Sequence, residues 1–74
     1  MQEMSEARQA IDAARAAGAV QYANPQLEQA LSSLKTAEEM LNERRFRDAR
    51  RNATQARDEA ILARQAAQDA SSAE

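Results

Sequence analysis

Several residue types are absent or nearly absent from this 74-residue chain. Cysteine, histidine and tryptophan do not occur, and glycine, proline, tyrosine and phenylalanine occur once each. Without cysteine there is neither a disulfide framework nor a thiolate metal site. Without histidine, the commonest general base and the commonest transition-metal ligand are both missing. We therefore expect a protein that is not an enzyme and has no catalytic residue, metal site or cofactor.

Long apolar runs are missing as well. The longest, residues 16–20, is far short of the ~20 residues that a membrane-spanning helix needs, and the polar residues after Met1 do not form a signal peptide. The net charge is −2, and Phe46 is the only aromatic residue among the basic ones, too few to stack successive bases. The sequence thus predicts no membrane-spanning segment and no nucleic-acid partner.

Strong helix formers dominate what remains, since alanine, glutamine, glutamate and arginine make up most of the chain. The sequence predicts a single all-α domain over residues 1–74, folded as an antiparallel three-helix bundle. The predicted helices cover about residues 4–22, 25–43 and 46–70, and residues 71–74 form a frayed tail. We expect a hairpin between the last two helices, in place of one long rod, because the apolar stripe and the charge balance both change near residues 41–46.

The apolar spacing within these helices is regular. In the first predicted helix, one stripe at spacings of three and four contains Met4, Ala7, Ile11, Ala14 and Gly18. In the second, the stripe contains Leu27, Ala30, Leu31, Leu34, Ala37 and Leu41. In the third, a heptad stripe that we call the alanine seam contains Phe46, Ala49, Ala53, Ala56, Ala60, Ala63, Ala67 and Ala70.

The alanine seam predicts close helix packing, because small side chains let helix backbones approach each other. The third predicted helix is longer than the second, so we expect the alanine seam to be uncovered beyond Ala63. An uncovered seam favours a homodimer through that end of the molecule.

The chain's single Gly, Tyr and Pro lie within eight residues, and we interpret this cluster as a structural corner. Pro25 suits the first position of a helix, and Asn24 before it suits the N-cap. Tyr22 is predicted to pack over Leu27. Gly18 has two interpretations, a C-cap of the first helix or a close contact inside it, and its place on the apolar stripe favours the contact.

Three arginines form the strongest candidate binding site. Arg50, Arg57 and Arg64 are seven residues apart and lie on one edge of the alanine seam. They fit either a cationic strip for an anionic ligand or pairing with acidic residues of neighbouring helices, and edge charges of this kind usually pair or stay solvated. The candidate partners are Glu28, Glu38, Glu39 and Asp12.

Two weaker candidates are apolar or backbone groups. Ile61 and Leu62 lie off the alanine seam. They form either an exposed patch for a partner or, as we expect, a patch that the first helix and Tyr22 cover. Free N–H groups at residues 26–28 are a weak candidate for an anion site. The default interpretation of these groups is a plain helix cap. Ser32 and Ser33 lack a neighbouring base, which agrees with a non-catalytic chain.

The predicted hairpin resembles a tetratricopeptide repeat. In that family an aromatic residue opens the second helix and small residues follow three and ten positions later, as Phe46, Ala49 and Ala56 do here. Ala37 corresponds to the small residue on the first helix. The turn departs from the pattern, because Arg44 stands where tetratricopeptide repeats usually have glycine.

Most of the chain also resembles a family of uncharacterised envelope domains of Gram-negative bacteria. The resemblance rests on "A-x-x-A-I-x-x-A-x-x-A-G-A-x-x-Y-A", matched from Ala7 to Ala23, followed by the hairpin; Asn24 is inserted where Pro more often follows directly. Such domains occur in small lipoproteins and beside peptidoglycan-binding domains. The resemblance implies a periplasmic or outer-membrane lipoprotein location, and the family has no established activity.

Taken together, these features lead us to expect a non-catalytic protein-interaction or scaffolding module of the bacterial envelope. Its partner would be another protein, of unknown identity. The sequence leaves two alternatives open. One is a binder of an anionic envelope polymer through Arg50, Arg57 and Arg64, and the other is a structural spacer behind a lipid anchor.

Overall fold

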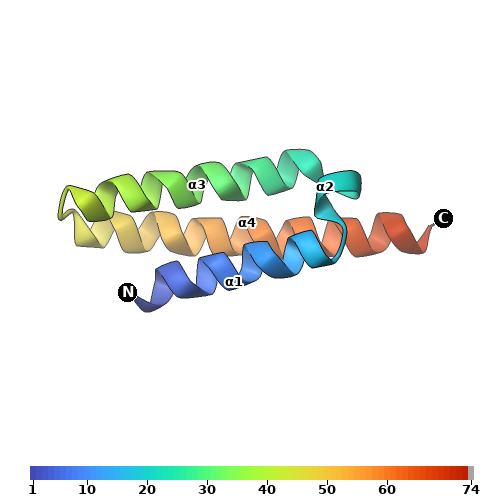
Figure 1. Ribbon diagram of the computed structural model, residues 1–74, viewed down its shortest axis with the longest axis horizontal. Coiled ribbons are helices and arrows are strands. Elements are labelled where there is room, and N and C mark those ends of the chain that lie inside the picture. The colour runs from blue at the N-terminus through green and yellow to red at the C-terminus, as the bar shows by residue number, and fades with distance from the viewer. Residues whose placement is uncertain (74) are drawn as a thin grey trace.

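The computed structural model describes residues 1–73, and this part of the chain contains helices and no strand. In chain order the helices are α1 (Gln2–Ala16), α2 (Ala19–Tyr22), α3 (Asn24–Asn42) and α4 (Phe46–Ser72). The predicted all-α bundle is confirmed, with α1, α3 and α4 as its three long helices (Figure 1). The predicted first helix over about residues 4–22 is wrong at its end, because α1 stops at Ala16 and α2 is a separate helix.

The C-terminal boundary differs from the prediction. Helix α4 continues to Ser72, two residues beyond the predicted end at Ala70. Ser71 and Ser72 of the predicted frayed tail are therefore helical. Glu74, the last residue of that tail, lies outside the described residues.

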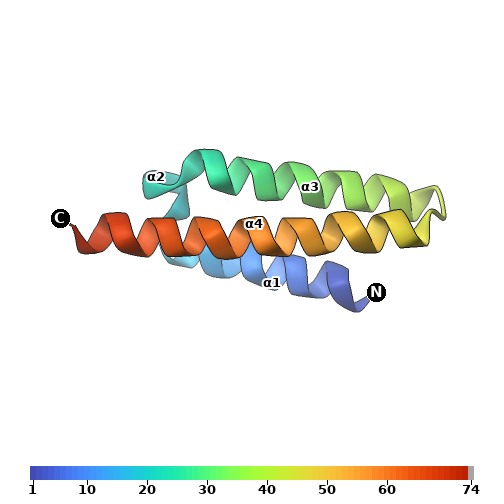
Figure 2. The ribbon, with the colours of Figure 1, turned by 180° about the vertical axis from the view of Figure 1, so that it is seen from behind.

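Helix α4 is the centre of the bundle. It contacts both α1 and α3 along its length, whereas α1 and α3 contact each other much less. Seen from either side, α1 and α3 flank α4 (Figures 1 and 2). Helix α3 runs antiparallel to α4, and α1 runs parallel to it, because the chain reverses at the α2 corner and again after α3.

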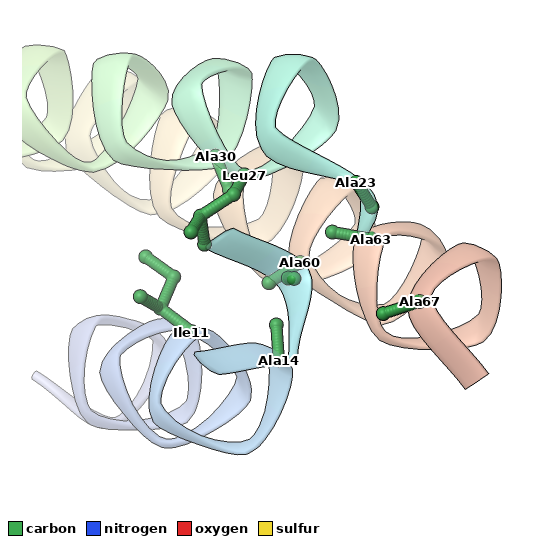
Figure 3. Packing of buried hydrophobic residues seen from close by; sticks show 9 residues of the cluster. Ile11, Ala14, Ala23, Leu27, Ala30, Ala60, Ala63 and Ala67 are labelled. Atoms are coloured by element: carbon green, nitrogen blue, oxygen red, sulfur yellow. The ribbon is translucent and has the colours of Figure 1, made fainter. Parts of the chain in front are cut away.

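Helices α1 and α4 bury the same repeating pattern. The buried residues of α1 are Met4, Ala7, Ile11 and Ala14, and those of α4 are Ala49, Ala53, Ala56, Ala60, Ala63 and Ala67. Met4 shares one buried cluster with Ala53. Ile11 shares another with Ala60 (Figure 3). Equal spacing of three and four on two parallel helices is the pattern of a coiled coil, so α1 and α4 stay in register along their contact.

The core combines a few large side chains with many alanines. Met4 and Leu27 are the largest fully buried side chains, and Ile11 is 2% exposed. Leu31, Leu34 and Leu41 of the predicted α3 stripe are only half-buried. Alanine on α4 leaves room for these larger residues of α1 and α3, so the three helices pack closely around a small core.

The alanine seam is covered further than predicted. Ala63 and Ala67 are fully buried, in one cluster with Ala19 of α2 and with Ala23, the residue before α3 (Figure 3). The prediction that the seam is uncovered beyond Ala63 is therefore wrong, because the corner of the chain folds over it. The homodimer prediction loses its structural basis with it.

The other end of the alanine seam is open. Phe46 is 51% exposed. Figure 1 shows the start of α1 well short of the α3–α4 turn, so α1 does not reach Phe46. The seam thus buries its alanines from Ala49 to Ala67 and leaves its aromatic end exposed to solvent.

The turn between α3 and α4 closes with a left-handed residue. The Arg44 N–H donates to the Leu41 carbonyl at 3.0 Å, and the Arg45 N–H donates to the Met40 carbonyl at 2.9 Å. This bonding is that of a Schellman motif, whose left-handed residue here is Arg44 at φ 62°. Asn42, two residues earlier, is still helical and is the last residue of α3.

Candidate functional site

Gly18 is a chain-reversal residue. Its φ of 92° lies in the left-handed region, directly between α1 and α2. The Gly18 N–H donates to the Arg15 carbonyl at 3.0 Å, which closes the end of α1. The predicted close contact inside the helix is therefore wrong, and the C-cap interpretation is correct. A stripe position does not identify a helical interior when it is held by glycine, the residue that adopts positive φ at the lowest cost.

The rest of the corner is also structural. Tyr22 packs against the core cluster that contains Leu27, as predicted. A Cβ placed on Gly18 would lie 3.2 Å from Tyr22 Cδ2, so the tyrosine ring lies over the glycine. Asn24 is already the first helical residue and Ala23 holds the N-cap position, so the predicted N-cap role of Asn24 is wrong by one residue.

The three stripe arginines do not act alike. Arg57 lies 4.0 Å from a Glu6 carboxylate oxygen on α1 and 2.9 Å from the Asp58 carboxylate, so it is paired. Arg50 and Arg64 are exposed, and neither has a carboxylate within 4.0 Å among residues 1–73. Of the two interpretations of the stripe, pairing holds only at Arg57, and with none of the acidic partners that the sequence suggested.

An open groove lies between α1 and α4, with a volume of about 320 Å³. Its lining residues are Glu6, Gln9, Ala10 and Ala13 from α1 and Arg57, Ile61 and Arg64 from α4. The floor is shallow and apolar because Ala10 and Ala13 are small and face Ile61 across the helix pair. Arg57 and Arg64 lie at its rim, where Arg57 is paired with Glu6 of the same lining and Arg64 supplies the positive charge.

Ile61 and Leu62 are more exposed than predicted. Ile61 is 43% exposed and Leu62 is 60% exposed, so α1 does not cover them. Ile61 lines the groove, whereas Leu62 does not. Adjacent residues on a helix point about 100° apart. Ile61 therefore lies on the side of α4 that faces α1, and Leu62 lies on a different side.

A second cationic region surrounds the α3–α4 turn. Arg45 is paired there, 2.7 Å from the Asp48 carboxylate and 3.7 Å from that of Glu43. Four further arginines are exposed and have no carboxylate within 4.0 Å in the described part of the chain: Arg44, Arg47, Arg50 and Arg51. Arg50 therefore belongs with this turn more than with Arg57 or Arg64.

The Ser33 hydroxyl donates to the Glu59 carboxylate, which ties α3 to α4. This contact supplies the acidic neighbour that the sequence did not reveal for Ser33, and its partly buried position between two helices gives it a structural role. Among residues 1–73, no three acidic side chains gather in a way that would hold a metal ion. No helix in that range is long and apolar enough to cross a membrane.

Fold and surfaces together define a small all-α bundle that offers an arginine-rimmed groove and a cationic turn. The chain belongs to a family described as a domain of unknown function, DUF4398, whose model matches residues 2–74. No curated protein and no solved structure matches the chain. The matched range includes the residues of both surfaces.

Proposed function

We propose that this domain is a non-catalytic protein-interaction or scaffolding module of the bacterial cell envelope. The observation that supports the proposal is the groove between α1 and α4. Its volume of about 320 Å³ is at the lower end of the ~300–1,000 Å³ range of ligand pockets. An open groove of this size along two helices suits side chains of a docked protein segment.

The chemistry of the groove favours an amphipathic segment with acidic residues. Ala10, Ala13 and Ile61 supply apolar contact, and Arg64 has no carboxylate within 4.0 Å in the described residues. A helix laid into such a groove would bury an apolar side chain on the floor and place a carboxylate near Arg64. The Arg57–Glu6 pair would hold the two walls of the groove together at its other end.

The envelope location is inferred from resemblance. The stretch from Ala7 to Ala23 is similar to envelope domains found in small lipoproteins, and we propose a periplasmic or outer-membrane lipoprotein location on that basis. The hairpin's likeness to a tetratricopeptide repeat supports a role in protein binding. Its small residues Ala37, Ala49 and Ala56 are all fully buried, and Arg44 takes the left-handed conformation where that family usually has glycine.

Position-specific photo-crosslinking tests the groove. A photoreactive residue placed at Ile61 should form one discrete protein adduct in cells that produce the domain. The same residue at Leu62 is the matched control, because Leu62 is exposed and adjacent but lies outside the groove. Arg64→Glu should reduce the adduct at Ile61. Equal adducts at both positions would mean that the groove is not the docking surface.

The two alternative functions predict different results. A structural spacer predicts no protein adduct at either position. A binder of an anionic envelope polymer is favoured by the unpaired Arg50 and Arg64, and it predicts salt-sensitive retention on that polymer. Charge reversal at Arg50 and Arg64 should then abolish retention, whereas reversal at Lys35 should not.

A further inference from the structure

The α3–α4 turn concentrates positive charge at one end of the molecule. Residues 42–51 contain five arginines and only two acidic residues, Glu43 and Asp48, although the whole chain carries a net charge of −2. Both views place this turn at one extreme of the long axis (Figures 1 and 2). The domain therefore has a strongly cationic tip.

Most of this charge is available to a ligand. Arg45 is held by Asp48 and Glu43. The remaining arginines are exposed and have no carboxylate within 4.0 Å among residues 1–73. Arg47, Arg50 and Arg51 are spaced at i, i+3 and i+4 on the first turns of α4, so they share one helix face. Arg44 adds a fourth guanidinium from the turn itself.

An aromatic side chain lies among these arginines. Phe46, the only phenylalanine of the chain, is 51% exposed at the first residue of α4. An exposed aromatic side chain beside unpaired guanidinium groups is the combination that peripheral proteins use at a membrane interface. The ring enters the headgroup region, and the cations bind lipid phosphates.

We propose that the α3–α4 turn docks on the surface of an anionic phospholipid bilayer. A bilayer suits this site better than an acidic peptide or a nucleic acid does. The tip is the end of a hairpin, and the groove of the described structure lies elsewhere, between residues 6–13 and 57–64. A protruding end meets a flat, deformable surface directly, whereas a docked helical peptide is held in a groove. One phenylalanine is also too few for base stacking along a nucleic acid.

Docking through the tip has a geometric consequence. The molecule is 45 Å long and 18 Å by 13 Å across. End-on contact through the turn would hold the long axis away from the membrane and leave the groove, which lies along the shaft, accessible to a protein partner. The proposal concerns a surface separate from the groove, so either proposal can fail without the other.

Vesicle co-sedimentation of the 74-residue chain tests the proposal. Vesicles of phosphatidylcholine with phosphatidylglycerol should bind the chain at low salt, and vesicles of phosphatidylcholine alone should not. The double variant Arg47→Ala/Arg51→Ala should bind about 25-fold more weakly, at about fivefold per arginine. The matched control Arg15→Ala/Lys35→Ala removes the same charge away from the tip and should bind like the unmodified chain.

The aromatic contribution has its own comparison. Phe46→Ala should weaken binding roughly threefold to tenfold, and Leu62→Ala, which removes a side chain of similar exposure on the same helix, should not. Phe46→Trp introduces the only tryptophan of the chain, and its fluorescence should shift to the blue on vesicles. Far-UV circular dichroism confirms that each variant is folded.

Three results would overturn the proposal. The first is equal binding to vesicles with and without phosphatidylglycerol, and the second is an equal loss of binding in the tip variant and its charge-matched control. The third is salt-sensitive binding to poly-glutamate without binding to anionic vesicles, which would identify the tip as a site for acidic polypeptides.

Discussion

Replacing Gly18 by alanine gives opposite results for the two interpretations of this residue. In the structure, Gly18 has φ 92°, and a left-handed backbone costs an L-residue about 1–2 kcal/mol. A Cβ there would also lie 3.2 Å from Tyr22 Cδ2 and 3.5 Å from Cε2, so the ring would have to move. If Gly18 lay inside a helix instead, alanine would be more stable than glycine by about 0.5–1 kcal/mol.

The net effect combines a cost in the folded state with a gain in the unfolded state. Alanine restricts the unfolded chain and returns about 0.4–1 kcal/mol of stability. With the ring displacement included, we expect Gly18→Ala to destabilise the domain by about 1–2 kcal/mol. For a domain of this size that lowers Tm by about 5–15 °C. Thermal unfolding followed by far-UV circular dichroism measures the change.

Two variants make the test specific. Gly18→Asn should cost less than Gly18→Ala, because asparagine adopts the left-handed conformation more readily. In a double-mutant cycle, Tyr22→Ala combined with Gly18→Ala should cost less than the sum of the single changes, because the contact with the ring is then gone. An unchanged or higher Tm for Gly18→Ala would refute the left-handed corner.

Three further predictions concern the hairpin and the core. Arg44→Gly should raise Tm by roughly 2–8 °C, because glycine relieves the left-handed strain at the turn; a lower Tm would contradict the Schellman closure. Leu27→Ala should lower the free energy of unfolding in urea by about 2–5 kcal/mol, because Leu27 is 2% exposed. Leu62 is exposed, so Leu62→Ala should change it by no more than about 0.5 kcal/mol. Equal effects of the two variants would contradict the assigned core. Ser33→Ala should lower the free energy of unfolding by about 0.5–1.5 kcal/mol, because the hydrogen bond to α4 is lost. Ser32 is exposed, so the control Ser32→Ala should leave the free energy of unfolding unchanged.

The long helices were predictable because their apolar spacing and their breaks agree. Pro25 marks the start of α3 within one residue, and the change of stripe near residues 41–46 marks the turn. The corner was harder to predict. Helix α2 is a single turn whose burial comes from contact with Ala63 and Ala67, residues far away in the sequence. Local spacing carries no information about such a contact.

The groove was missed, although the sequence holds a signal for it. Glu6, Ala10 and Ala13 have the same spacing as Arg57, Ile61 and Arg64. Two parallel helices in one heptad register place such sets side by side. The predicted bundle already placed the first helix parallel to the third, but the sequence did not reveal the register between them, which decides which arginine of the stripe faces α1.

The most direct test of the proposed docking surface is to fill the groove. Ala13 is half-buried in its floor, and Ala13→Phe should occupy the space with a side chain that points away from the core. The measurement is the Kd for the partner captured at Ile61, with Tm as a check on folding. We predict a Kd raised at least tenfold at an unchanged Tm. An unchanged Kd would contradict the account, because the partner would then bind elsewhere on the domain.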